Sequence, residues 1–141
     1  MTPDQIALVR ESFARIAPQR ETVAARFYEK LFDIDPSVRP LFRGDLRAQG
    51  TKLMAALGAV VASLDDLGPV LDGVRDLARR HVRYGVEERH YASVGQALMA
   101  TLQEGFGPAF TPALREAWAI AYGALSGAMI DATRRTLEDA A

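Results

Sequence analysis

The strongest constraint on the fold is an apolar stripe at helical spacing that one histidine interrupts. Its members recur every three or four residues and so share one face of a helix: Val70, Val74, Leu77, His81 and Tyr84. A histidine in a core-facing stripe needs a partner, which can be a carbonyl, a carboxylate, a water or a metal. A lone histidine of this kind is more often a hydrogen-bonded core residue than a ligand, so its role depends on the other stripes.

Prolines and capping residues divide the rest of the chain into further helical segments. We predict helices from a cap at Thr2 to Pro18, from Gln19 to Ile34, from Asp45 to about Leu64, from Pro69 to Gly85, from Glu88 to the break at Gly105–Pro108 and from Thr111 onward, with a short helix over Pro36–Phe42. No segment alternates as a strand would. The sequence therefore predicts one all-α domain over residues 1–141, with six long helices and one short helix.

The composition is that of a globular domain and excludes several kinds of site. The chain has 141 residues, of which 49% are hydrophobic and 25% charged, and no cysteine. Without cysteine there is no disulfide, zinc–thiolate site, iron–sulfur cluster or covalent haem attachment, and a cytoplasmic location is expected. No signal peptide is visible, and the apolar run Leu53–Ala62 is too short to cross a bilayer, which takes about 20 residues. We expect no membrane insertion.

The net charge argues against a nucleic-acid partner. The formal net charge is −1, so no global positive field draws the chain to a phosphate backbone. We interpret the arginines at two predicted helix ends as solvated faces: Arg79, Arg80, Arg83, Arg134 and Arg135. We also expect His90, which follows two glutamates and an arginine, to lie at an exposed helix start without a ligand role.

Two other predicted stripes also carry a hydrogen-bonding residue. Tyr28 lies on the apolar face of the second helix, where an ordinary core tyrosine is the simpler interpretation. Gln49 lies on the third stripe, where it is either half-solvated near the helix start or buried with partners. If the stripes of Tyr28, Gln49 and His81 face one core, a flat, apolar, iron-bearing cofactor explains all three. Haem iron needs an axial imidazole, and Phe42 is a flat side chain suited to pack on a macrocycle.

The order and spacing of these residues resemble a globin. The similarity is to the bacterial type found in flavohaemoglobins and in Vitreoscilla-type single-domain haemoglobins. It rests on Arg26–Phe32 with Asp35-Pro36, Leu41-Phe42, Gln49 four residues before Leu53, Leu77 four residues before His81, Tyr91 ten residues after His81, and Ala117-Trp118 with Ala121-Tyr122-Gly123. These stretches cover essentially the whole chain.

The resemblance implies a role for each matching residue. It implies non-covalent haem b with His81 as the proximal iron ligand, and a distal group of Tyr28, Gln49 and Leu53 facing a bound diatomic gas such as O2, NO or CO. It further implies a haem-packing set of Phe42, Leu57, Leu77, Val86, Val94, Tyr122 and Met129. Lys52 and Arg80 are candidate partners of the haem propionates, although a solvated lysine is the simpler interpretation of Lys52.

The sequence departs from the flavohaemoglobin pattern behind the proximal histidine. The resemblance implies that a tyrosine and a glutamate support that histidine, and Tyr91 matches the tyrosine. The glutamate position falls on Thr133, and Asp131 lies two residues earlier. A carboxylate hydrogen-bonded to a ligating histidine raises its basicity, so its absence puts the electron push for oxygen activation in question.

The expected function is haem-based binding of diatomic gases. The resemblance implies reversible oxygen binding that supports nitric oxide dioxygenation. No dinucleotide site is visible in the sequence, so turnover needs an external reductase. Oxygen storage, oxygen delivery or gas sensing is the alternative within this class, and a haem-free helical interaction module is the alternative of another class. The sequence leaves open whether the protein is a monomer or a homodimer.

Overall fold

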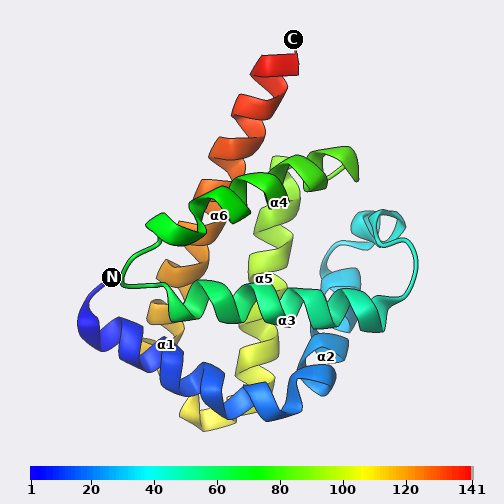
Figure 1. Cartoon of the computed structure of the whole chain (residues 1–141). Coiled ribbons are helices and arrows are strands. Elements are labelled where there is room, and N and C mark those ends of the chain that lie inside the picture. Colours follow the sequence, from blue (N-terminus) through cyan, green and yellow to red (C-terminus); the bar gives the residue numbers. More distant parts are fainter. Residues whose placement is uncertain (141) are drawn as a thin grey trace.

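The computed structural model describes residues 1–140 and is all-helical over that range (Figure 1). The six α-helices are α1 (Pro3–Ile16), α2 (Arg20–Ile34), α3 (Leu46–Ala62), α4 (Leu71–Arg83), α5 (Glu88–Phe106) and α6 (Pro112–Ala140). Short 3-10 helices lie between them: η1 (Ala17–Gln19), η2 (Pro36–Leu41), η3 (Gly68–Val70) and η4 (Gly107–Ala109). The predicted fold class is confirmed.

The helices begin at the predicted caps. The Thr2 hydroxyl accepts a hydrogen bond from the Gln5 N–H at 3.1 Å, and the Gln5 side chain accepts one from the Thr2 N–H at 3.0 Å. Asp45 caps α3 in the same way, since its carboxylate accepts from the Arg47 N–H at 3.0 Å. Such caps satisfy backbone donors that have no partner inside the helix, and each is worth about 1 kcal/mol.

Several helix boundaries differ by one or two residues from the sequence prediction, and two of them have a structural cause. The fourth helix begins at Leu71 rather than at Pro69, because Gly68–Val70 forms a separate 3-10 turn. The third ends at Ala62, two residues before the predicted end. There the Arg10 guanidinium donates to the Ala62 carbonyl at 2.7 Å, satisfying an acceptor that the helix leaves free. A capping contact from a side chain so distant in the sequence leaves no local signal.

The core is divided into two clusters that meet at α6. The larger cluster contains the inner faces of α1, α2, α3, α5 and the first half of α6, with Trp118 almost completely buried. The smaller cluster consists of Val74, Ala78, Tyr91, Met129 and Ala132, so it joins α4 to the start of α5 and the second half of α6. Leu125 packs against both clusters. α4 therefore packs mainly on α6, whereas α3 packs mainly on α2.

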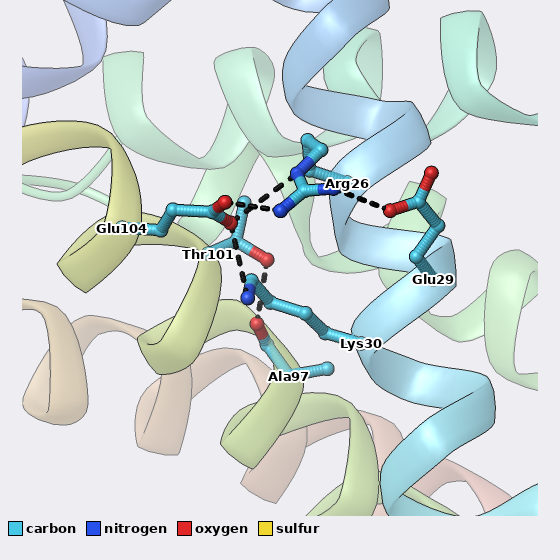
Figure 2. A network of polar contacts seen from close by, with 6 residues as sticks. All are labelled: Arg26, Glu29, Lys30, Ala97, Thr101 and Glu104. Carbon is cyan, nitrogen blue, oxygen red and sulfur yellow. Dashed lines mark hydrogen bonds and ion pairs between the residues drawn. The ribbon is translucent and has the colours of Figure 1, made fainter.

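An exposed ionic network holds α2 against α5 (Figure 2). The Glu104 carboxylate of α5 pairs with Arg26 and, at 3.0 Å, with Lys30, both on α2. Arg26 also pairs with Glu29 at 2.6 Å, one turn further along α2. Because the groups are exposed, each pair contributes only about 0.2–1 kcal/mol, and the network mainly sets the register of the two helices.

None of the helices within residues 1–140 combines the length and apolar character that a membrane span requires.

Candidate functional site

His81 is held in one orientation by its own helix. Its Nδ1 lies 2.7 Å from the Leu77 carbonyl oxygen, one turn earlier in α4. A carbonyl can only accept, so Nδ1 carries the proton and Nε2 keeps its lone pair. Burial lowers the pKa of His81, the Leu77 carbonyl opposes this shift, and the nearby Arg80 charge lowers the pKa further. The ring is therefore a neutral imidazole with Nε2 as its available ligand atom.

The end of α4 is shaped by Gly85. Its φ of +92° lies in the left-handed region that favours glycine, as predicted for a helix cap. The chain then turns back, and the Val86 N–H donates to the His81 carbonyl at 3.0 Å. Leu77 and Val86 both pack against the smaller core cluster. The backbone on either side of His81 is thus anchored to the same cluster.

Apolar side chains of intermediate burial lie on the inward faces of several helices. They pack against the core yet keep part of their surface open: Phe42, Leu53, Leu57, Leu77, Val86, Val94 and Leu125. Sequence reasoning selected all of these except Leu125. Two other predicted haem-packing residues have different surroundings. Met129 is buried, and the Tyr122 hydroxyl donates a hydrogen bond to the Tyr91 carbonyl at 2.6 Å.

Tyr28 is buried in an aromatic group on the side formed by α2. Its ring stacks on Phe32 with centroids 6.1 Å apart and meets Phe42 edge-on at 5.3 Å. Burial raises the pKa of Tyr28 to about 12. The hydroxyl forms no hydrogen bond within residues 1–140, so its proton is available to a ligand.

Gly50 allows α3 to pack closely against α2 beside Tyr28. A Cβ at Gly50 would lie 2.9 Å from the Ala24 Cβ and 3.5 Å from Cε2 of Tyr28. The first distance is shorter than real carbon atoms tolerate, so only glycine fits without a shift of one helix. The sequence offered Gly50 as one of several glycines, and only the helix crossing shows its importance.

The Gln49 side-chain amide already forms a hydrogen bond within the protein. Its Nε2 donates to the Arg43 carbonyl at 2.5 Å, in the turn before α3, and its side chain is half-buried. The interpretation of Gln49 as a half-solvated residue near the helix start fits this geometry. Lys52 and Arg80 are both exposed, and neither side chain forms a hydrogen bond or ion pair within the described residues. They remain free to meet anionic groups.

Tyr91 belongs to the smaller cluster, and Thr133 lies beside it. Tyr91 is 8% exposed and Thr133 3% exposed, and neither hydroxyl has a hydrogen-bond partner among residues 1–140. Burial raises the pKa of Tyr91, and the neighbouring Thr133 side chain opposes this rise. Asp131 is exposed and pairs with Arg135 at 3.2 Å. Of the two alternatives behind His81, the structure therefore places Thr133, and not Asp131, beside Tyr91.

The expectation that His90 is exposed is wrong, although it does lie at the start of a helix. The side chain is only 5% exposed, and its Nδ1 accepts a hydrogen bond from the Glu87 N–H at 2.8 Å. It therefore completes a capping box at the start of α5, with Glu87 as the other member. The signal was present, since the third position of a helix is where capping-box partners occur, but histidine is not the usual residue there.

Sequence reasoning also missed Arg39, which supports Phe42. The Arg39 guanidinium lies 5.0 Å from the centre of the Phe32 ring and donates to the Phe42 carbonyl at 3.3 Å. The cation thus ties the segment after η2 to the aromatic group around Tyr28. An arginine four positions before a glycine turn gives no sequence signal for this contact.

A globin family model matches residues 25–129, which is most of the chain. The chain belongs to the globin family. This globin is 34% identical over 137 residues to the flavohemoprotein of Bordetella pertussis and 32% identical over 136 residues to the neuroglobin of Danio rerio. The first alignment covers 95% of this globin but only 34% of the flavohemoprotein, and the second covers 86% of each protein.

Solved structures give the same result. A bacterial globin from Campylobacter jejuni superposes with a TM-score of 0.87 at 25% identity, covering 97% of this globin and 99% of that chain. An engineered carbene transferase, made from a candidate nitric oxide dioxygenase of Rhodothermus marinus, has a TM-score of 0.88 at 28% identity, with 98% and 96% of the two chains covered. This globin spans about a third of the length of the flavohemoproteins it matches.

Membership of the globin family implies haem binding, and the residues present fit that group. No set of three or more histidine, cysteine, aspartate or glutamate side chains gathers to hold a bare metal ion within residues 1–140. A single imidazole nitrogen would suit an iron whose remaining donors come from a porphyrin. The partly buried apolar side chains described above are of a kind that suits contact with an apolar ring. The predicted propionate partners Lys52 and Arg80 have no ion pair within residues 1–140.

Proposed function

We propose that this globin binds haem b non-covalently through Nε2 of His81 and uses it to bind O2, NO and CO. One observation carries the proposal. The hydrogen bond between Nδ1 of His81 and the Leu77 carbonyl leaves Nε2 as the free ligand atom, on a helix that faces half-buried apolar side chains. When bound, haem iron supplies reversible binding of diatomic gases and the reaction of oxygen with nitric oxide to give nitrate.

The chain's own residues orient and stabilise the gas ligand. The Tyr28 hydroxyl keeps its proton at neutral pH and has no competing partner, so it can donate to a ligand that carries partial negative charge. Leu53 and Phe42 exclude water from the same side, since both pack against the larger core cluster. Gln49 becomes a second donor only if its amide leaves the Arg43 carbonyl.

Nitric oxide dioxygenation with electrons from a separate reductase is the proposed physiological reaction. Its support is the similarity to flavohemoproteins and to a structure derived from a candidate nitric oxide dioxygenase. The absence of cysteine suits the reducing cytoplasm, where such a reductase would operate. Oxygen storage or delivery is the second candidate, because His81 has no carboxylate partner that would strengthen its electron donation.

The absorption spectrum of the purified protein tests haem binding. We would compare the ferric, dithionite-reduced and CO-bound states of the wild type with those of His81→Ala and, as a matched control, His90→Ala. We expect a Soret band that shifts with reduction and CO in the wild type and the control, and that is lost or altered in His81→Ala. If the wild type lacks a Soret band even after haemin is added, the proposed function is wrong.

Nitrate production then separates the two candidate functions. Dioxygenation predicts one nitrate per haem when the oxygen-loaded protein meets nitric oxide, and many per haem when a flavoprotein reductase and reduced nicotinamide are added. If nitrate stops at one per haem under every reductant tested, the protein is an oxygen carrier or sensor. Dioxygenation is then not its catalytic role.

A further inference from the structure

We propose that Ser93 of α5 and Asp35, at the corner between α2 and η2, act together as positioning residues for the Tyr28 hydroxyl on the distal side of the candidate site. This inference rests on the proposed function, since it concerns how the chain places a donor toward a bound gas. The hydrogen bond between the two side chains fixes the start of η2, and η2 leads directly to Phe42, whose ring contacts Tyr28. The two polar residues act through that ring and not on the gas itself.

Asp35 serves two backbone segments at once. Its N–H donates to the Leu31 carbonyl at 2.8 Å and so ends α2, while its carboxylate accepts from the Ser37 N–H at 3.1 Å and so begins η2. The Ser37 hydroxyl also donates to this carboxylate. These bonds, followed by the one from Ser93, lower the pKa of Asp35, so the carboxylate is ionised at neutral pH and acts only as an acceptor.

The hydroxyl of Ser93 connects this corner to α5. It donates to the second carboxylate oxygen of Asp35 at 2.9 Å, and both side chains are partly buried. Because η2 packs mainly on α2, this bond holds the corner from a second helix. Another contact from α5, between Arg89 Nη1 and the Ser37 hydroxyl oxygen, is 3.5 Å long and therefore weak. Ser93 is thus the stronger polar link between the corner and α5.

The end of η2 places two groups on the distal side. The Phe42 N–H donates to the Arg39 carbonyl at 3.1 Å, so Phe42 closes the last turn of η2. Its ring meets the Tyr28 ring edge-on, with centroids 5.3 Å apart. The next carbonyl, that of Arg43, accepts the hydrogen bond from Gln49. A shift at the start of this six-residue helix would therefore move the ring beside one distal residue and the acceptor of the other.

The consequence is control over the donor's position without contact with the gas. A hydrogen bond weakens steeply when its distance or angle departs from the optimum. The Tyr28 hydroxyl has no hydrogen bond within residues 1–140, so the packing of its ring determines where its oxygen lies. Among the aromatic neighbours of Tyr28, Phe42 is the one whose place depends on Asp35 and Ser93.

Removal of the Ser93 hydroxyl tests the proposal in the haem-loaded protein. Ser93→Ala should raise the O2 dissociation rate by roughly threefold to tenfold, because the Tyr28 hydroxyl is then displaced but not absent. The C–O stretching band of the CO-bound protein, measured by infrared spectroscopy, should broaden or shift. The backbone amides of η2 should exchange their hydrogens faster. Ser126→Ala is the matched control, since the Ser126 hydroxyl bonds to a carbonyl of its own helix, and it should change none of the three.

A double variant separates positioning from general destabilisation. If Ser93 acts through the Tyr28 hydroxyl, Ser93→Ala should change the O2 dissociation rate by less than about twofold when Tyr28→Phe is already present. An equal increase with and without the Tyr28 hydroxyl would show that the serine acts elsewhere. That result would overturn the proposal.

Substitutions of Asp35 distinguish hydrogen-bond geometry from charge. Asparagine keeps an oxygen that accepts from the Ser37 N–H and gains an amide group that can donate to the Ser93 oxygen. Asp35→Asn should therefore stay within about twofold of the wild-type rate, whereas Asp35→Ala should match or exceed the effect of Ser93→Ala. If Asp35→Asn loses oxygen as fast as Asp35→Ala, the proposal fails. If Asp35→Ala does not fold, Ser93→Ala alone decides.

The positioning role and haem binding fail in different ways. If the wild type has a normal Soret band but Ser93→Ala leaves its O2 dissociation rate and C–O band unchanged, the positioning role is refuted and haem binding stands. A wild type without a Soret band, even after haemin is added, refutes haem binding itself, and the positioning role falls with it.

Discussion

The two sides of the candidate haem site are held in different ways. On the proximal side, His81 is oriented by a backbone carbonyl of its own helix and flanked by residues that pack into the smaller cluster. On the distal side, the Tyr28 hydroxyl has no hydrogen bond within residues 1–140, and the Gln49 amide is bonded to a turn outside α3. The proximal geometry therefore follows from helix formation, while the distal geometry depends on side chains that can change partners when a ligand arrives.

The largest effect is expected on the distal side at Tyr28. Tyr28→Phe removes the hydroxyl donor while preserving the ring that packs on Phe32 and Phe42. A hydrogen bond to a charged acceptor is worth about 1.5–3 kcal/mol, so the O2 dissociation rate should rise by roughly 10- to 100-fold. Stopped-flow mixing of the oxygen-bound protein with CO measures this rate. An unchanged rate would mean that Tyr28 does not face the ligand.

Substitutions of two glycines test how closely the helices on the two sides of the candidate site are packed. Gly50→Ala pushes a Cβ to 2.9 Å from Ala24, so we expect a loss of about 1–3 kcal/mol in the free energy of unfolding. Gly73→Ala on α4 meets no atom within 4 Å, and it should stabilise the protein by about 0.5–1 kcal/mol. Urea denaturation measures both. Equal changes at the two sites would contradict the close α2–α3 crossing.

A smaller effect is expected at Gln49. Because its amide nitrogen already donates to the Arg43 carbonyl, Gln49→Leu should raise the O2 dissociation rate less than tenfold, which is below about 1.4 kcal/mol. The same stopped-flow experiment measures it beside Tyr28→Phe. If the two variants lose oxygen equally fast, the amide must leave Arg43 in the ligand-bound protein, and the distal side has two working donors.

The smallest effect is expected when the O2 dissociation rate is measured as a function of pH. Burial raises the pKa of Tyr28 to about 12, so the hydroxyl keeps its proton and remains a donor well above neutrality. The O2 dissociation rate should therefore stay constant between about pH 6 and about pH 10, and increase only as the pH approaches the raised pKa. A rise in the rate near neutral pH would show that the tyrosine is not buried as described.

The sequence predicted the helices well because their ends are set by local chemistry. Thr2, Asp45 and Gly85 act within one turn of their own position, so capping rules locate them without knowledge of the fold. The third helix was predicted two residues too long because the contact from Arg10 comes from a different helix. Local patterns cannot report such a contact.

The sequence predicted which residues form the candidate site better than it predicted how their side chains are oriented. Helical spacing and family resemblance selected Tyr28, Gln49 and His81, but the hydrogen bond from Gln49 to Arg43 depends on the path of a turn. The choice between Asp131 and Thr133 depended on which face of α6 meets Tyr91, since two residues along a helix differ by about 200°. That orientation follows only from how α6 packs.

The division of the core into two clusters has a consequence for how the chain folds and takes up haem in the cell. α4 is joined to the rest of the molecule mainly through one helix, α6, and the small cluster, and a segment that rests on one neighbour opens as a unit. A ligand that binds the closed form stabilises it by mass action, so haem bound at His81 acts as a folding partner as well as a reactive group. Without haem, amide hydrogen exchange should be fastest in α4, and the yield of intact protein then follows the supply of haem.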